Sequence, residues 1–367
     1  TVYVPDASRA VGVVSQLLSA GQSAAYRAGV AADYAKVREQ HAQKKGVQLV
    51  ALEAARANRF KSVDAAPKPK QLGVQVLANY DLARLAPCLD WAPFFQTWDL
   101  AGSWPAILDD PKVGETARQV FADGQAMLER IVEEKWLSAN GVFGLFPANA
   151  VGDDVEIYTD DSRQTVRLTW HNLRQQQVRP EGKPNYCLSD FIAPKDSGVA
   201  DYVGAFAVTA GLGIERKLAE FAAQHDDYNA ILLKALADRL AEAFAEHLHQ
   251  RVRREFWGYA ADEALSNEEL IAEKYRGIRP AAGYPACPDH TEKGPLFALL
   301  EAEKHTGMAL TESFAMHPAA SVSGFYLAHP EARYFAVTKI GRDQLEDYAR
   351  RKGMSVAEAE RWLAPVL

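Results

Sequence analysis

Residues 279–290 carry the side chains with the clearest chemical potential, in the order Arg-Pro-Ala-Ala-Gly-Tyr-Pro-Ala-Cys-Pro-Asp-His. Three prolines fix backbone φ angles and remove hydrogen-bond donors, so we predict a rigid, irregular loop. Arg279 offers a planar fork of donors to a carboxylate, Gly283 allows a ligand to approach the backbone, and Tyr284 adds a ring and a hydroxyl. From these residues alone, a ligand-binding loop and a purely structural loop are equally good interpretations.

Common catalytic and nucleotide-binding motifs are missing from the sequence. The glycine pairs at 211–213 and 141–144 lack the further glycine, helix start and acidic residue of a dinucleotide site. The P-loop, zinc-protease and serine-hydrolase signatures are also absent. His247 and His249 lie two residues apart on a predicted helix and point in different directions, so we interpret them as surface residues rather than a metal pair.

The elements that must position the loop are short strands and one long helix. Strand-like runs occur at residues 141–146, 155–158, 165–170, 202–209, 322–327 and 334–340. Short polar turns between several of these runs favour antiparallel neighbours. Apolar residues recur every fourth position from 232 to 256, which predicts a helix over 217–256 with this stripe in the core. With one or two amphipathic helices at 342–363, the expected class is α+β with an antiparallel sheet.

The start of the chain has a different pattern. Residues 2–4 read as a brief strand, residues 6–8 offer an N-cap, and a helical run follows at 11–18. One strand–helix unit cannot close a parallel sheet, so we interpret it as the last piece of a doubly wound domain whose earlier part belongs to a longer protein. A second helix is expected at 24–45. We therefore divide the chain into residues 1–40 and a main domain at 41–367.

Composition limits the functional classes. No apolar run approaches the roughly 18 residues of a membrane helix, and a net charge of −7 disfavours nucleic-acid binding. Cys88, Cys187 and Cys287 are widely spaced, which suits a reducing cytoplasm and disfavours a structural zinc site. Residues 36–70 hold nine Lys or Arg against three Asp or Glu. A solvated basic segment is the favoured interpretation of this charge, and a docking surface for an acidic partner is the alternative.

Several motifs together resemble one known family. Arg279, Gly283 and Tyr284 fit Arg-x-x-x-Gly-Tyr, which is similar to the S-adenosylmethionine-contacting motif of the reactivation domain of cobalamin-dependent methionine synthase. The resemblance extends to residues 89–98, 144–149, 152–154, 224–228 and 312–316. It covers the chain from about residue 46 onward, and residues 2–18 resemble the end of the adjoining cobalamin-binding domain. His317 departs from the family, in which a tryptophan is usual before the proline.

The resemblance implies a C-shaped α+β domain, preceded by a helical tail of the cobalamin domain, that holds S-adenosylmethionine in a shallow central groove. By position, the implied ligand contacts are Asp90, Arg279, Ala281, Gly283, Tyr284, Tyr334 and Phe335, with Glu242, Glu273 and His290 as further candidates. Asp90 would balance a cationic group and Arg279 would bind the carboxylate. The alternatives are that Asp90 caps a helix entered at Trp91, and that Tyr334 and Phe335 are ordinary strand aromatics.

The implied function is reactivation of the parent enzyme, which makes methionine from homocysteine and methyltetrahydrofolate. S-adenosylmethionine would donate a methyl group to cobalamin after flavodoxin or an equivalent reductase has supplied an electron. Cobalamin is bound mainly by the neighbouring domain of the same polypeptide and zinc by another, so this chain alone is not expected to make methionine. The alternative is a non-catalytic module that senses S-adenosylmethionine and selects the domain arrangement. A free-standing methyltransferase is disfavoured by the missing Rossmann glycines.

Overall fold

The computed structural model describes residues 2–3, 7–43, 47–62 and 64–367. The chain forms two compact units, Thr1–Gln48 and Leu49–Leu367, which we call the smaller and the larger unit. The smaller unit consists of helices α1 (Ala7–Leu18) and α2 (Ser23–Gln43), as predicted. The predicted strand at 2–4 is wrong for residues 2–3, because no described residue of this unit offers a strand to pair with them; Val4 and Asp6 lie outside the described residues. The assignment of residues 1–40 to a cobalamin-binding domain remains a prediction.

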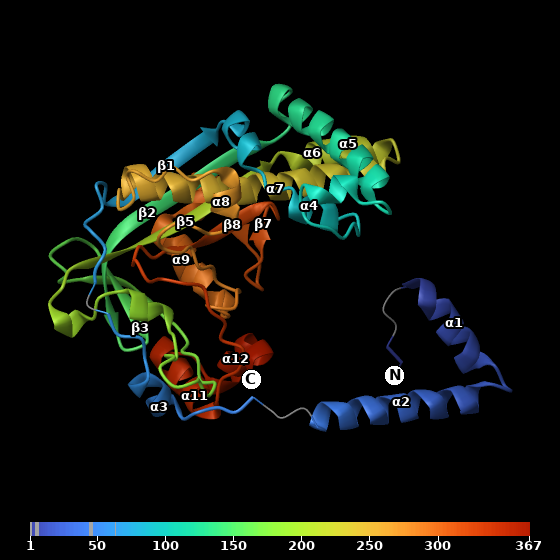
Figure 1. The fold of residues 1–367 in the computed structure, drawn as a ribbon, viewed down its shortest axis with the longest axis horizontal. Coiled ribbons are helices and arrows are strands. Elements are labelled where there is room, and N and C mark those ends of the chain that lie inside the picture. Colours follow the sequence, from blue (N-terminus) through green and yellow to red (C-terminus); the bar gives the residue numbers. More distant parts are fainter. Residues whose placement is uncertain (1, 4–6, 44–46, 63) are drawn as a thin grey trace. The chain divides into compact units, whose positions relative to one another are not determined.

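A six-stranded antiparallel sheet forms the framework of the larger unit (Figure 1). Its strands are β1 (Gly73–Tyr80), β2 (Ser138–Val151), β3 (Asp154–Tyr158), β4 (Val166–Trp170), β5 (Asp201–Leu212) and β8 (Ser321–Tyr326). The order is β4-β3-β2-β5-β8, and β1 also pairs with β2. One edge of β2 serves two strands in turn, since β1 pairs near its beginning and β3 near its end. A separate two-stranded sheet contains β6 (Ala309–Leu310) and β7 (Met316–His317).

Helices cover both faces of the sheet, which explains why β2 is apolar along almost its whole length. Phe143 and Leu145 point into the core shared with α4 (Ala92–Gln96), α5 (Gly114–Glu133) and α7 (Asp227–Arg251). Val142 and Phe146 point into the opposite core, formed with α9 (Lys293–Leu300) and α10 (Ala302–Thr306). The alternation follows from the two-residue repeat of a strand. The predicted α+β class with an antiparallel sheet is confirmed, and in Figure 1 the larger unit curves from α5 past the sheet to α12 (Val356–Leu363).

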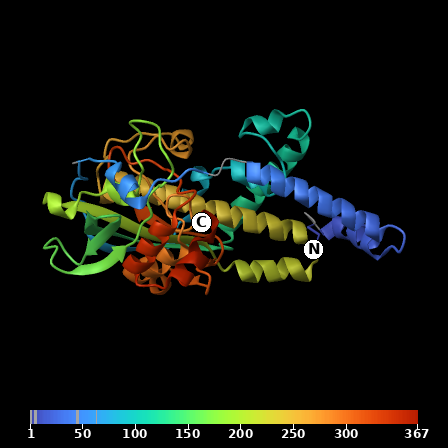
Figure 2. The same cartoon turned by 90° about the horizontal axis from the view of Figure 1, so that it is seen from below.

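The long helix predicted at 217–256 is interrupted. It is divided into α6 (Ile214–Ala223) and α7, which lie side by side (Figure 2), and α7 ends in a π-helical turn at Val252–Phe256. His225 has a φ of 55°, and the Asp226 carboxylate accepts a hydrogen bond from the Asn229 amide at 3.0 Å, so a new helix begins there. The predicted apolar stripe is buried from Leu232 to residue 252.

Four further helices complete the larger unit. They are α3 (Leu52–Ala57), α8 (Asn267–Ile271), α11 (Arg342–Lys352) and α12. The last two confirm the predicted C-terminal helices. Among the described residues, no helix combines the length and apolar character needed to cross a membrane.

In the larger unit, one predicted strand is absent and β1 was missed. The run at 334–340 is not a strand, because its amides bond to loops: Val337 donates to the Pro285 carbonyl at 2.8 Å and Ile340 to the Val366 carbonyl at 2.7 Å. Conversely, β1 was not predicted, although it pairs with β2 over residues 73–77.

The basic segment at 36–70 contains one arginine with a clear structural role. Arg56 lies within 2.8 Å of both Glu53 and Asp153 and within 2.6 Å of Asp347. These ion pairs connect α3 to the sheet and to α11, so Arg56 is not available for docking. Lys44 and Lys45 lie outside the described residues.

Candidate functional site

The loop at 279–290 is anchored where it begins. Ile278 and Leu327 exchange two backbone hydrogen bonds, at 2.9 and 3.0 Å, and the Pro280 carbonyl accepts from the Phe325 amide at 2.8 Å. Pro280 has no amide hydrogen, so it fits a position where only its carbonyl has a partner. The loop therefore starts as an extension of the sheet beside β8, and its predicted irregular course is confirmed.

Further along, the loop makes a tight turn. Gly283 has a φ of 91°, its amide donates to the Cys287 carbonyl at 2.8 Å, and the Cys287 amide returns a bond to Tyr284 at 2.9 Å. A positive φ of this size favours glycine. The turn presents the Tyr284 ring, which is 61% exposed.

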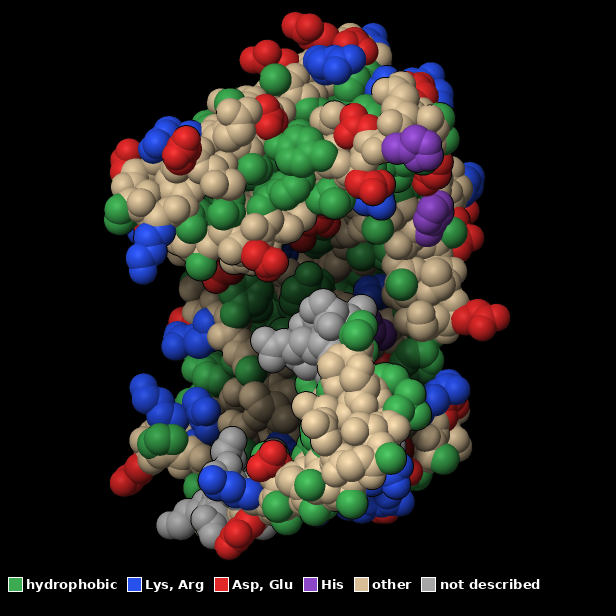
Figure 3. Space-filling view, turned by 90° about the vertical axis from the view of Figure 1, so that its right-hand side faces the viewer, with side chains coloured by type: hydrophobic (Ala, Val, Ile, Leu, Met, Phe, Trp, Pro, Cys, Tyr) green, Lys and Arg blue, Asp and Glu red, His purple; other side chains and the backbone are tan. Residues whose placement is uncertain are grey.

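Three neighbouring cavities lie along this loop, with volumes of about 130, 290 and 400 Å³. Glu242 lines all three, Glu273 and Arg279 line the first and second, and Tyr284 lines the second and third. The shared residues join the cavities into one recess, which we call the central groove. Figure 3 looks toward this side of the larger unit, where hydrophobic side chains lie deep in the recess and acidic side chains lie along its upper edge.

The groove collects nearly all the residues that the sequence predicted. Its lining includes Asp90 in the first cavity, Ala281, Tyr334 and Phe335 in the second, His290 in the third, and the shared residues Glu242, Glu273, Arg279 and Tyr284. Gly283 shapes the adjoining turn and is not itself a lining residue. Residues from distant parts of the sequence therefore meet at one place. Whether each contacts a ligand remains a prediction.

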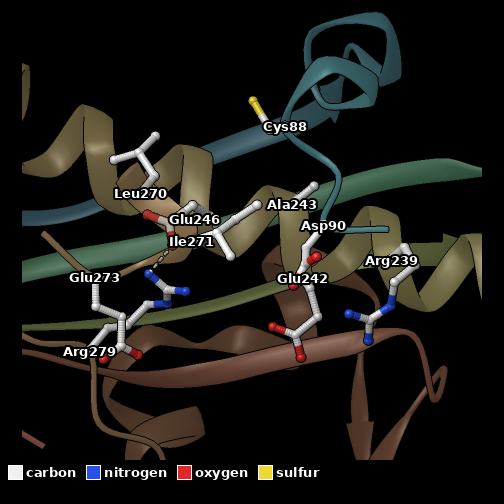
Figure 4. A pocket seen from close by; sticks show the side chains of 10 residues that line it. All are labelled: Cys88, Asp90, Arg239, Glu242, Ala243, Glu246, Leu270, Ile271, Glu273 and Arg279. Carbon is white, nitrogen blue, oxygen red and sulfur yellow. Dashed lines mark ion pairs between the residues drawn. The ribbon is translucent and has the colours of Figure 1, made fainter. Parts of the chain in front are cut away.

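Arg279 is held from one side only (Figure 4). Its Nη1 lies 2.6 Å from Glu246 Oε2, donates to Tyr275 Oη at 3.1 Å, and lies 3.4 Å from His249 Nδ1. In the described part of the chain, its Nε and Nη2 have no partner, and its side chain is 20% exposed. Burial opposes the charge, but Glu246 and the tyrosines outweigh it and raise the pKa of Arg279. The guanidinium therefore stays charged and turns a free Nε/Nη2 edge toward the groove.

His249 corrects the prediction of a surface residue. Its side chain is fully buried and stacks on the Tyr326 ring at a centroid distance of 5.0 Å. Burial, with the nearby charges of Arg253 and Arg279, lowers the pKa of His249 well below its ordinary value. The neutral imidazole can therefore accept a hydrogen bond at Nδ1.

The first cavity is acidic. Asp90, Glu242, Glu246 and Glu273 line it together with two guanidinium groups, those of Arg239 and Arg279 (Figure 4), so four negative charges face two positive ones. Burial raises the pKa values of Glu242 and Glu273, although Arg279 opposes this for both. Such a lining favours a ligand that has cationic groups and one carboxylate.

The second cavity offers aromatic and apolar surface. Tyr284, Tyr334 and Phe335 line it with Phe206 and Val322. The Tyr334 hydroxyl accepts from the Arg279 amide at 3.0 Å, which fixes the ring relative to the loop. These surfaces suit a flat heterocycle.

Asp90 lies directly before α4 and also borders the groove. Its Oδ1 accepts a hydrogen bond from the Ala92 amide at 3.0 Å, so it bonds the first residue of α4, although the N-cap position is Trp91, which makes no side-chain cap bond. The same side chain lines the first cavity. The bond to the Ala92 amide holds the carboxylate next to Glu242 (Figure 4).

Sequence reasoning missed several groove residues, notably Cys88, Arg239 and Glu246. Glu246 lies one helical turn after Glu242 on α7, and the four-residue spacing could have placed both on one face. Cys88 and Arg239 belong to no motif and would not have been found this way.

Comparison with known proteins identifies the family. The family model for "Vitamin B12 dependent methionine synthase, activation domain" matches residues 81–353, well over half of the chain. The chain belongs to this family. The activation domain also resembles the crystal structure of the MetH reactivation domain bound to AdoHcy, with a TM-score of 0.84 and 59% sequence identity over 87% of this chain and 98% of that chain. The predicted family is thereby confirmed.

The same comparison bears on the ligand. AdoHcy is S-adenosylhomocysteine, and it is bound in that related structure.

The described part of this activation domain has no group of three or more His, Cys, Asp or Glu side chains arranged to hold a metal ion.

Proposed function

We propose that this activation domain binds S-adenosylmethionine in the central groove and presents its methyl group for reactivation of the parent methionine synthase. The observation that carries the proposal is the free Nε/Nη2 edge of Arg279 beside an acidic cavity. An amino acid carboxylate would pair with that edge, and the ammonium and sulfonium charges would lie near Asp90, Glu242 and Glu273. The AdoHcy in the related structure supports this ligand class.

Adenine would occupy the second cavity. Tyr284, Tyr334 and Phe335 offer ring surface there, and Pro280 and Ala281 line the same cavity. The domain would contribute binding and orientation rather than proton transfer, because a methyl group passes from a sulfonium to a nucleophile without acid or base catalysis. The carbon–sulfur bond breaks with its electron pair remaining on sulfur, which leaves neutral S-adenosylhomocysteine.

Cobalamin would lie against the third cavity during this reaction. It mixes apolar residues such as Met316 with the hydroxyls of Ser321 and Ser323 and the ammonium of Lys293. Lys293 is buried, and no described acidic side chain pairs with it. Ser321 and Ser323 already donate to the Pro318 carbonyl at 2.7 Å and to Met316 Sδ at 3.3 Å, so their oxygens would offer acceptors to the amide side chains of a large ring. Cobalamin, held mainly by a neighbouring domain of the same polypeptide, would supply the methyl acceptor after flavodoxin or an equivalent reductase has delivered one electron.

Calorimetric titration of the chain with S-adenosylmethionine tests the proposal. We expect saturable binding with one ligand per chain. We also expect no methionine from homocysteine, since the other domains of the enzyme supply that chemistry. Absence of saturable binding would overturn the proposed ligand, and methionine formation by the purified chain would overturn the proposed division of labour.

A further inference from the structure

We propose that Glu246 is a positioning residue that makes the central groove selective for ligands with a carboxylate. The inference rests on the proposed function, because it concerns how Arg279 meets the ligand. Glu246 touches Arg279 on the side away from the free Nε/Nη2 edge. Although Glu246 also lines the first cavity, its effect on a ligand carboxylate would pass through the orientation of that guanidinium.

Glu246 contacts only one nitrogen of the Arg279 guanidinium, Nη1. Its side chain is 9% exposed, and its Oε2 lies 2.6 Å from Arg279 Nη1. Tyr275 Oη and His249 Nδ1 lie 3.1 and 3.4 Å from the same nitrogen. With acceptors gathered around Nη1, rotation of the guanidinium would give up a buried ion pair. The fork therefore keeps Nε and Nη2 toward the groove, in the geometry that a carboxylate needs for two parallel bonds.

A different role for Glu246 would be to neutralise Arg253, whose side chain is also buried. The distances argue against this role. Arg253 already pairs with Glu263 through two hydrogen bonds, at 2.8 and 2.7 Å, whereas its nearest atom lies 3.9 Å from Glu246 Oε1. Glu263 therefore neutralises Arg253, and Glu246 is committed to Arg279.

The two candidate effects of Glu246 on affinity have opposite signs. As a nearby negative charge, Glu246 would repel a ligand carboxylate, so its removal would tighten binding. As the anchor of Arg279, it would favour the carboxylate, so its removal would weaken binding. Our proposal predicts weakening, and only for ligands that have the carboxylate.

The experiment compares S-adenosylhomocysteine with its decarboxylated form, which keeps the adenosine, the thioether and the amine. Calorimetry gives the ratio of the two Kd values for the wild-type chain, Glu246→Ala, Glu246→Gln and the matched control Glu263→Ala. Glu263 is a suitable control because it is a carboxylate of similar burial, 7% exposed, that pairs with the other arginine. Apo melting curves report on folding.

For the wild-type chain, we expect S-adenosylhomocysteine to bind roughly ten- to a hundredfold more tightly than its decarboxylated form. Glu246→Ala should bring this ratio close to one by weakening only the intact ligand. Glu246→Gln keeps a neutral acceptor of the same shape, so its ratio of Kd values should lie between those of the wild-type chain and Glu246→Ala. This variant also tests the proposal if the alanine variant does not fold. Glu263→Ala should melt earlier and keep the wild-type ratio.

Other outcomes would contradict either the positioning role of Glu246 or the proposed function. A wild-type ratio in both Glu246 variants, or tighter binding of the intact ligand, would overturn the positioning role. An equal loss of ratio in Glu263→Ala would show that general loosening is responsible and would also overturn it. If the wild-type chain bound neither ligand, the proposed function itself would fail.

Discussion

The imidazole of His290 occupies the space that a β-carbon on Gly283 would need. An ideal β-carbon there would overlap His290 Cε1. The His290 side chain is exposed, but moving it aside would give up the contact of its Nδ1 with Lys293 Nζ at 3.0 Å, and Lys293 also donates to the Phe314 carbonyl at 3.1 Å. The turn that presents Tyr284 is thus packed against this ring at its glycine.

Gly283→Ala should therefore damage both the turn and ligand binding. It combines a positive φ with a steric clash, and we expect a loss of stability of about 1–3 kcal/mol together with weaker S-adenosylhomocysteine binding. Gly182→Ala is the matched control, since Gly182 has a φ of 74° but open space around the added carbon. Melting curves and calorimetry for both variants provide the measurement. If the two variants lost equal affinity, the His290 contact would be unimportant.

Arg279→Lys should weaken S-adenosylmethionine binding by roughly ten- to a hundredfold while the fold survives. A lysine keeps the charge but cannot offer two parallel donors to a carboxylate. Arg276→Lys is the control, because Arg276 donates to the Ala328 carbonyl at 3.1 Å and does not line the groove. Near-native affinity in Arg279→Lys combined with a lowered melting temperature would make Arg279 a structural residue instead.

Affinity for S-adenosylmethionine should fall as the solution becomes acidic. Burial raises the pKa values of Glu242 and Glu273, so both begin to lose their charge at a higher pH than an ordinary glutamate. A bound sulfonium favours their charged forms, which links binding to deprotonation. Titrations between about pH 7.5 and pH 5 should show a steeper loss of affinity for S-adenosylmethionine than for S-adenosylhomocysteine, whose sulfur carries no charge. Equal slopes for the two ligands would contradict a role for these carboxylates near the sulfonium.

Docking of an acidic reductase on the basic segment would weaken as salt increases. Arg59 and Lys61 are exposed, so their double replacement by glutamine should reduce association with flavodoxin at low salt. Arg56→Gln should instead lower the melting temperature, because Arg56 is committed to three carboxylates. Binding that is independent of salt and unchanged in the double variant would exclude this surface.

Periodicity predicted the elements better than their ends and partners. The stripe from 232 to 252 marked the buried face of α7 because every fourth residue returns to one side of a helix. It could not reveal the break at His225, where a left-handed residue and the Asp226 cap separate two helices. The run at 334–340 has the composition of a strand, but the partners that would make it one are absent there.

The candidate site was predictable where a motif existed and not where only packing decides. The loop at 279–290 could be located from its prolines and from the family resemblance. The burial of His249 and the ion pair of Glu246 with Arg279 depend on which face of α7 meets the loop. Neither His249 nor Glu246 belongs to a motif. Tertiary contacts of this kind have no local signature in a single sequence.

The pairing of the loop with β8 has a consequence for solubility. β8 is the last strand of the sheet, and a bare final strand invites pairing with another molecule. Here the Phe325 amide donates to the Pro280 carbonyl, and Leu327 exchanges two backbone hydrogen bonds with Ile278. The proline that follows Arg279 cannot donate in turn, so the ladder stops after this contact. The start of the ligand loop thus covers the end of β8 and blocks edge-to-edge pairing there.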